Sequence, residues 1–153
     1  MTLPNLGAHI PWAQVDRCLA PALALGLAPE IAIKGPELDV IDERAILRTA
    51  EVLAEAGMRP RVHAPFFDLN PGALDPLIRQ ATGQRLQQTL RFAGLLQADL
   101  MIIHPGVDKW RYPKLEQAWL NLALEFCPPL VEQAGHNGCR LAIENIYEES
   151  PDT

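Results

Sequence analysis

Three polar residues stand at nearly equal intervals, each directly after a short apolar run. His63 ends RVH, His104 ends LMIIH and Glu144 ends LAIE. The intervals are 104 − 63 = 41 residues and 144 − 104 = 40 residues. Two imidazoles and one carboxylate form a typical ligand set for zinc, manganese or a related divalent metal. The residue types and their spacing therefore predict one shared site, for which a divalent metal is one candidate occupant.

Two other interpretations of these residues stay open. A histidine at the end of a single buried strand is more often a structural residue than a ligand. The same three side chains could also hydrogen-bond the hydroxyl groups of a sugar without any metal. Three such groups at the same point of successive units favour a functional site over a coincidence.

Further polar and aromatic residues lie at the ends of the apolar runs along the chain or in the loops that follow these runs. The candidate substrate-binding residues are His9, Lys34, Asp68, Asn145, Trp12 and Trp110. Asp68 and Asn70 could support the ligands or form an ordinary Asx turn, and Asn145 could equally be a turn residue. The two tryptophans could cover the apolar face of a sugar, or pack between loops.

The elements that must position these residues alternate regularly along the chain. Apolar runs predict strands at 6–10, 30–34, 61–63, 100–104 and 141–144. Helical spacing predicts helices at 13–25, from the cap Asp42 to Gly57, from Asp75-Pro76 to about Gln97, and at 115–134 with an interruption considered at Pro128-Pro129. Parallel strands need such crossovers. The pattern predicts an α/β fold of about five parallel strands and four helices.

This alternation fits either a doubly wound sheet or a (β/α) barrel. The sequence after the first strand, HIPWAQ, carries no glycine fingerprint for a dinucleotide. That absence argues against a nucleotide-binding doubly wound fold and leaves a flavodoxin-like one open. In both arrangements functional groups gather where parallel strands end and loops begin.

Composition narrows the class of protein. The chain has 153 residues, 48% of them hydrophobic and 21% charged, as in ordinary globular domains. A net charge of −6 without a basic stripe disfavours nucleic acid as a partner. The three cysteines show no CxxC pairing, no signal peptide is evident, and apolar runs fall well short of the roughly 20 residues that cross a bilayer. We expect a soluble, cytoplasmic protein without a membrane partner.

Three motifs together indicate a family. VHAPFFDLNPGALD, MIIHPGVDKWRY and LAIENIYEESP resemble the xylose-isomerase-like TIM-barrel superfamily, and the resemblance runs through most of the chain. That superfamily contains sugar and sugar-phosphate isomerases and epimerases, together with apurinic endonucleases of the endonuclease IV type. HPG alone would be a weak signal, whereas the three motifs in this order are specific.

The resemblance implies a divalent-metal site, for Zn, Mn, Mg or Co, at the carboxyl-terminal rim of the barrel. Glu144 matches the glutamate that binds metal after the fifth strand and, in the isomerases, takes part in proton transfer, which makes it the candidate catalytic residue. His63 and His104 match histidines that bind zinc in the endonuclease branch and often line the sugar pocket in the isomerase branch.

The resemblance implies a metal-dependent sugar or sugar-phosphate isomerase or epimerase, with an apurinic endonuclease as the alternative. A degenerate barrel that binds a ligand without turnover is the non-enzymatic alternative. A complete eight-stranded barrel takes about 250 residues, whereas this sequence ends 153 − 144 = 9 residues after Glu144. We therefore expect residues 1–153 to form one truncated domain, a partial (β/α)8 barrel with little activity alone, which could self-associate through exposed sheet edges.

Overall fold

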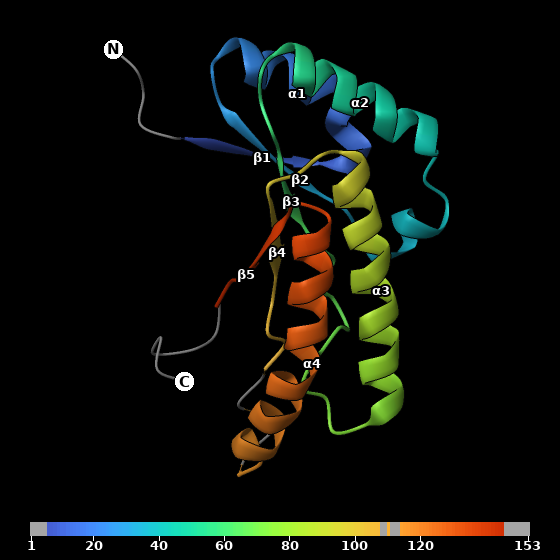
Figure 1. The fold of residues 1–153 in the computed structure, drawn as a ribbon, viewed down its shortest axis with the longest axis vertical. Coiled ribbons are helices and arrows are strands. Elements are labelled where there is room, and N and C mark those ends of the chain that lie inside the picture. The colour runs from blue at the N-terminus through green and yellow to red at the C-terminus, as the bar shows by residue number, and fades with distance from the viewer. Residues whose placement is uncertain (1–5, 108–109, 111–113, 146–153) are drawn as a thin grey trace.

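The computed structural model describes residues 6–107, 110 and 114–145. Its five strands form one parallel sheet in the order β1-β2-β3-β4-β5 (Figure 1). The strands are β1 (Gly7–Pro11), β2 (Ala28–Ala32), β3 (Arg61–His63), β4 (Leu100–Ile103) and β5 (Arg140–Ile143). The helices are α1 (Val15–Ala24), α2 (Glu43–Glu55), α3 (Pro76–Leu95) and α4 (Glu116–His136), with short 3₁₀ turns η1 (Trp12–Gln14) and η2 (Gly35–Asp39). The predicted partial barrel of five parallel strands and four helices is confirmed.

One face of the sheet carries the hydrophobic core and is covered by the helices (Figure 1). A single apolar row crosses all five strands in register, Ile10–Ile31–Val62–Met101–Leu141. Its central members Ile31, Val62 and Met101 are completely buried. Side chains alternate between the two faces of a strand, so the intervening residues project from the opposite face. This second face is the inner face of the partial barrel.

Helix caps were predicted well because their signals are local. Asp42 precedes α2 and accepts a hydrogen bond from the Arg44 amide at 3.0 Å. Asp75 precedes α3 and accepts from the Leu77 amide at 2.8 Å, with Pro76 in the first helical position. An aspartate that bonds an otherwise unpaired amide of the first turn stabilises a helix start. Both helices therefore begin where the sequence indicates.

Most predicted bounds lie within one or two residues of the observed ones, and β2 and α4 differ most, since β2 begins and ends two residues before the predicted 30–34. β2 ends at Ala32, because the next residues lead into η2, where the Lys34 amide donates to the Glu37 carboxylate at 2.7 Å. The interruption considered at Pro128-Pro129 does not occur, since α4 continues through both prolines. Both prolines are exposed, so the carbonyls that lose a helical partner can bond water instead. Among the described helices, none has the length and apolarity to cross a membrane.

Candidate metal centre

The three predicted ligands converge at the carboxyl ends of neighbouring strands. His63 is the last residue of β3, while His104 and Glu144 directly follow β4 and β5. Nε2 of His63 lies 3.1 Å from Nε2 of His104, and Oε2 of Glu144 lies 3.3 Å from the first and 3.2 Å from the second. In the described part of the chain, these residues form the group whose donor atoms could hold one metal ion.

A hydrogen bond of Nδ1, on the side of the ring opposite Nε2, orients His63. The side chain is almost fully buried, and its Nδ1 lies 2.9 Å from the carbonyl oxygen of Ala64. A carbonyl only accepts, so Nδ1 carries the hydrogen and the lone pair of the neutral ring is on Nε2. That lone pair faces Nε2 of His104 at 3.1 Å and the Glu144 carboxylate, which is also an acceptor, at 3.3 Å. Two facing acceptors repel each other unless a cation or a proton lies between them.

The spacing of the three atoms suits a metal ion. Zinc binds imidazole nitrogen and carboxylate oxygen at about 2.0–2.2 Å, which puts tetrahedral ligand atoms about 3.3 Å apart. The observed separations of 3.1–3.3 Å agree with that geometry. The carbonyl of Ala64 supplies the outer hydrogen bond that metal-binding histidines usually make. The residues present therefore fit a divalent metal as a chelating set.

Aromatic and charged neighbours surround the two imidazoles. Phe66 stacks on His104 with ring centroids 4.3 Å apart and meets His63 edge-on at 5.7 Å. His9 also meets the His63 ring edge-on at 5.7 Å, and its Nδ1 lies 3.0 Å from Oε1 of Glu30. His9 is thus a predicted substrate-binding residue that lies in ring contact with a candidate ligand.

The other predicted substrate-binding residues are spread over several loops, and one of them packs against the hydrophobic core. Lys34 is exposed just beyond β2, Asn145 is exposed beside Glu144, and Asp68 is exposed with a positive φ of 62°. Trp12 is half-buried and meets Phe92 of α3 edge-on at 5.1 Å, which places it against the hydrophobic core.

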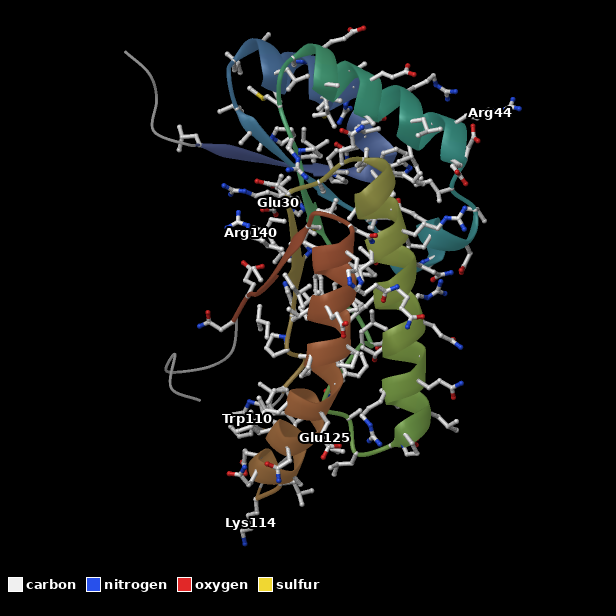
Figure 2. The ribbon with its side chains drawn as sticks, in the orientation of Figure 1. Glu30, Arg44, Trp110, Lys114, Glu125 and Arg140 are labelled. Atoms are coloured by element: carbon white, nitrogen blue, oxygen red, sulfur yellow. The ribbon has the colours of Figure 1, made fainter. Side chains whose placement is uncertain are left out.

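Trp110 is 84% exposed and lies near the beginning of α4, away from Glu30 and Arg140 (Figure 2). The position of Trp12 favours packing, one of the two roles that the sequence left open. The ring of Trp110 is accessible to solvent, and the structure assigns no ligand to it.

Contacts to α3 and α4 that shape the site were not identified from the sequence. Asn70, for which a ligand-supporting role or an Asx turn was considered, accepts the Gly72 amide on Oδ1 at 3.0 Å, as in an Asx turn. Its backbone amide also donates to Thr82 of α3 at 2.9 Å, and its Oδ1 accepts from Nε1 of Trp119 at 2.8 Å. Gly106 packs so closely on the loop after β3 that a β-carbon there would lie 2.7 Å from the Leu69 carbonyl oxygen. Glycine in HPG was the one available signal for this contact.

The fold agrees with a family-level comparison. A sequence model of one family, described as the xylose isomerase-like TIM barrel, matches residues 27–152. The chain belongs to this family. The resemblance inferred from the three motifs is therefore confirmed, and the xylose isomerase-like family accounts for the parallel sheet and its helix-covered face.

Individual relatives support the fold and differ from the chain in length. The TTHB071 protein from Thermus thermophilus, in a crystal soaked with ZnCl2, is 28% identical with a TM-score of 0.83, over 97% of this chain and 59% of that one. D-psicose 3-epimerase from Clostridium cellulolyticum H10 with D-tagatose is 15% identical with a TM-score of 0.73, over 90% and 52%. The uncharacterized protein MJ1311 from Methanocaldococcus jannaschii is 27% identical over 85 residues, 56% of this chain and 29% of its own. The chain thus spans between about a third and three fifths of these relatives.

Proposed function

We propose that this chain carries the first part of the active site of a divalent-metal-dependent sugar or sugar-phosphate isomerase or epimerase. The observation that carries the proposal is the convergence of two imidazole nitrogens and one carboxylate oxygen at 3.1–3.3 Å. They meet at the end of a parallel sheet where α/β barrels place their chemistry. Membership of the xylose isomerase-like family and the epimerases among its structural neighbours agree with this reaction class.

Each residue of the centre has a distinct role in this proposal. His63 and His104 present nitrogen lone pairs and hold the ion, and the Ala64 carbonyl keeps the His63 ring in the required orientation. A bound divalent metal would polarise a substrate carbonyl and so acidify the neighbouring C–H bond. Glu144 presents Oε2 to the histidines, while its side chain remains 51% exposed and accessible to substrate. We assign its carboxylate the removal and return of the proton at the carbon beside the carbonyl.

The other predicted residues would bind the substrate around this centre. We propose that His9 and Asn145 hydrogen-bond sugar hydroxyls, because the first adjoins the His63 ring and the second follows Glu144. Lys34 and Asp68 are exposed charged groups beyond β2 and β3 that could reach the same ligand. Relatives are longer than this chain, and we propose that residues 1–153 form a single partial domain whose remaining ligands come from further barrel strands.

An apurinic endonuclease is the second candidate. The two histidines at zinc-ligand spacing favour it, and the similar Thermus thermophilus protein was studied after soaking with ZnCl2. The net charge of −6 opposes it, since attraction to the phosphate backbone supplies most of the affinity of a protein for DNA. On this balance the isomerase or epimerase is the better supported function.

Metal binding by the 153-residue chain is the first experiment. Calorimetric titration with Mn²⁺, Co²⁺ or Zn²⁺ should show one ion per chain, and His63→Ala and His104→Ala should weaken binding beyond the roughly 10- to 100-fold typical of residues that merely orient a ligand. His136→Ala is the matched control, because His136 is exposed at the end of α4. An unchanged affinity in the His63 and His104 variants would remove the basis of the proposal.

The reaction class is tested by proton exchange. With Mn²⁺ or Co²⁺ and a ketose in D₂O, NMR should show deuterium slowly entering the carbon beside the carbonyl, in line with the little activity expected of a partial barrel. Glu144→Gln should abolish the exchange. Glu125→Gln is the control, since Glu125 is exposed on α4 (Figure 2) and is not one of the three residues of the centre. Cleavage of an abasic-site duplex without any sugar exchange would favour the endonuclease instead.

A further inference from the structure

We infer that Phe66 is a positioning residue that holds both histidine ligands in the orientation needed to bind a metal. The inference rests on the proposed metal site and adds a residue to it. Phe66 lies three residues after His63, in the loop that leaves β3. Its ring contacts the ring of His63 and that of His104, which come from two different strands.

The ring geometry differs for the two histidines. Phe66 and His104 are stacked, with centroids 4.3 Å apart and planes 23° from parallel. Phe66 meets His63 at 71°, with centroids 5.7 Å apart. The terminal torsion of a histidine side chain is broad and roughly two-fold, so rotamer preference alone does not fix the plane of the ring. A stacked neighbour fixes that plane and so fixes the direction of the Nε2 lone pair.

The backbone that carries Phe66 is itself held in place. The carbonyl of Phe66 accepts a hydrogen bond from the Leu69 amide at 3.2 Å, closing a turn in which Asp68 adopts a left-handed conformation. Directly after this turn, Asn70 bonds Thr82 of α3 and Trp119 of α4. Gly106, in the loop after His104, lies against Leu69 and Asn70. The stacking ring is thus placed by a loop tied to two helices and to the second ligand loop.

Phe66 and Phe67 differ in what they contact, which makes them a natural comparison. Phe66 is 37% exposed and touches both imidazoles, whereas Phe67 is 77% exposed and its ring lies 4.4 Å from that of Phe66. Burial in the core does not explain an aromatic ring at the rim that is partly exposed to solvent. Contact with the two ligand rings does explain it.

The test compares Phe66→Leu with the control Phe67→Leu in the full 153-residue chain. Co²⁺ is the probe, because its visible absorption reports coordination geometry as well as binding. We expect Phe66→Leu to weaken Co²⁺ binding by about tenfold or more, as residues that orient metal ligands do, and to alter the visible spectrum. Phe66→Tyr, which keeps the planar ring, should restore both, and Phe67→Leu should resemble the wild type.

Each outcome separates the inference from the proposal on which it depends. If the wild type binds Co²⁺ and Phe66→Leu matches Phe67→Leu in affinity and spectrum, the positioning role is wrong while the metal site stands. If the wild type binds no Co²⁺, the proposed function fails and the inference falls with it. Circular dichroism monitors folding. Should Phe66→Leu unfold, Phe66→Met fills a similar volume without a planar ring, and the same loss is expected.

Discussion

His63 is the residue around which the candidate centre is organised. It is buried, it bonds the carbonyl of its own neighbour, and it contacts His9, Phe66 and His104 through its ring. A buried imidazole that uses Nδ1 as a donor presents Nε2 as a base toward whatever lies on the other side. Here the other side holds the carboxylate oxygen of Glu144 at 3.3 Å. His104 Nε2 lies 3.1 Å and 3.2 Å from these two acceptors, and a bound metal ion would coordinate all three atoms.

The tautomer of His63 can be measured directly. In long-range ¹H–¹⁵N spectra of the metal-free protein at about pH 8, we expect the neutral ring to carry its hydrogen on Nδ1, because the Ala64 carbonyl can only accept. His136, which is exposed at the end of α4, serves as the reference ring. A neutral His63 with its hydrogen on Nε2 would contradict this account of how the ligand is oriented.

At the residue scale, the sequence predicted the candidate metal ligands but not the contacts that orient them. His63, His104 and Glu144 could be predicted because each βα unit returns the chain to the same edge of the sheet, so equal spacing implies proximity. The contacts of Phe66 depend instead on the path of an irregular loop, and those of Glu30 on the register of β1 with β2. A local sequence pattern predicts neither the path of this loop nor the register of β1 with β2.

At the scale of elements, the site depends on two loops that touch. The loop after β3 and the loop after β4 meet where Gly106 faces Leu69 and Asn70. Gly106 adopts a φ of +72°, a region that is strained for residues with a β-carbon. The glycine therefore serves both the turn of its own loop and the close approach of the other.

Gly106→Ala should be more costly than an alanine at another glycine of the same conformation. Gly57 has a φ of +66°, and nothing lies within 4 Å of the place that a β-carbon would take, so Gly57→Ala should cost only the left-handed strain of about 1–2 kcal/mol. At Gly106 the same strain is joined by a 2.7 Å contact with the Leu69 carbonyl, and its free-energy cost should be larger. Urea unfolding of both variants measures the difference. Equal losses would mean that the loops separate easily.

A second link between elements joins η2 to α3. Arg85 of α3 donates to both carboxylate oxygens of Asp39, with Nη2 2.9 Å from Oδ2. The Arg85 hydrogen bond holds the pKa of Asp39 below its ordinary value, although the carboxyl is exposed. A depressed folded-state pKa contributes stability above the unfolded pKa, and this contribution is lost as pH falls through the folded value.

Asp39→Asn should therefore lower the free energy of unfolding slightly at neutral pH, and the gap to the wild type should close as pH falls below the ordinary range for aspartate. The effect should be small because exposed ion pairs are screened by solvent. Urea unfolding over a series of pH values measures the gap. In an Arg85→Gln background the gap should shrink to the smaller contribution of Gln88, whose side-chain amide also donates to Asp39 at 3.4 Å. A gap of undiminished size there would assign the effect to something other than the Arg85–Asp39 pair.

Element boundaries were predictable where a side chain marks them. Asp42 and Asp75 bond the first turns of their own helices, so a few residues of sequence are sufficient. The end of β2 and the continuity of α4 through Pro128-Pro129 depend on tertiary surroundings, namely pairing with β1 and β3 and access of water to the helix surface. Local propensity extended β2 to residue 34 and suggested a break in α4 at Pro128-Pro129, and the tertiary surroundings override both.

At the scale of the whole molecule, the described sheet has one face that the helices cover and one face, the inner one, that they leave uncovered. Helices cover the apolar row Ile10–Ile31–Val62–Met101–Leu141 (Figure 1). On the inner face the row His9–Glu30–Arg61–Leu100–Arg140 is mostly polar, and Glu30 and Arg140 lie on the side of the sheet away from α3 and α4 (Figure 2). In the described sheet, β1 and β5 are the edge strands. Ile143 of β5 is 56% exposed, and Leu124 and Val131 of α4, the helix that precedes β5, are 63% and 51% exposed.

An edge strand flanked by exposed apolar side chains is a template for association with another chain. We therefore expect the 153-residue protein to self-associate as its concentration rises, in sedimentation velocity or light scattering. Ile143→Lys should shift this equilibrium toward the monomer, because a charge beside β5 would be costly to bury. Val40→Lys is the control, since Val40 is 83% exposed and lies beside η2, distant in sequence from β5. A monomer at every concentration, or equal effects of the two lysines, would show that the β5 edge does not drive association.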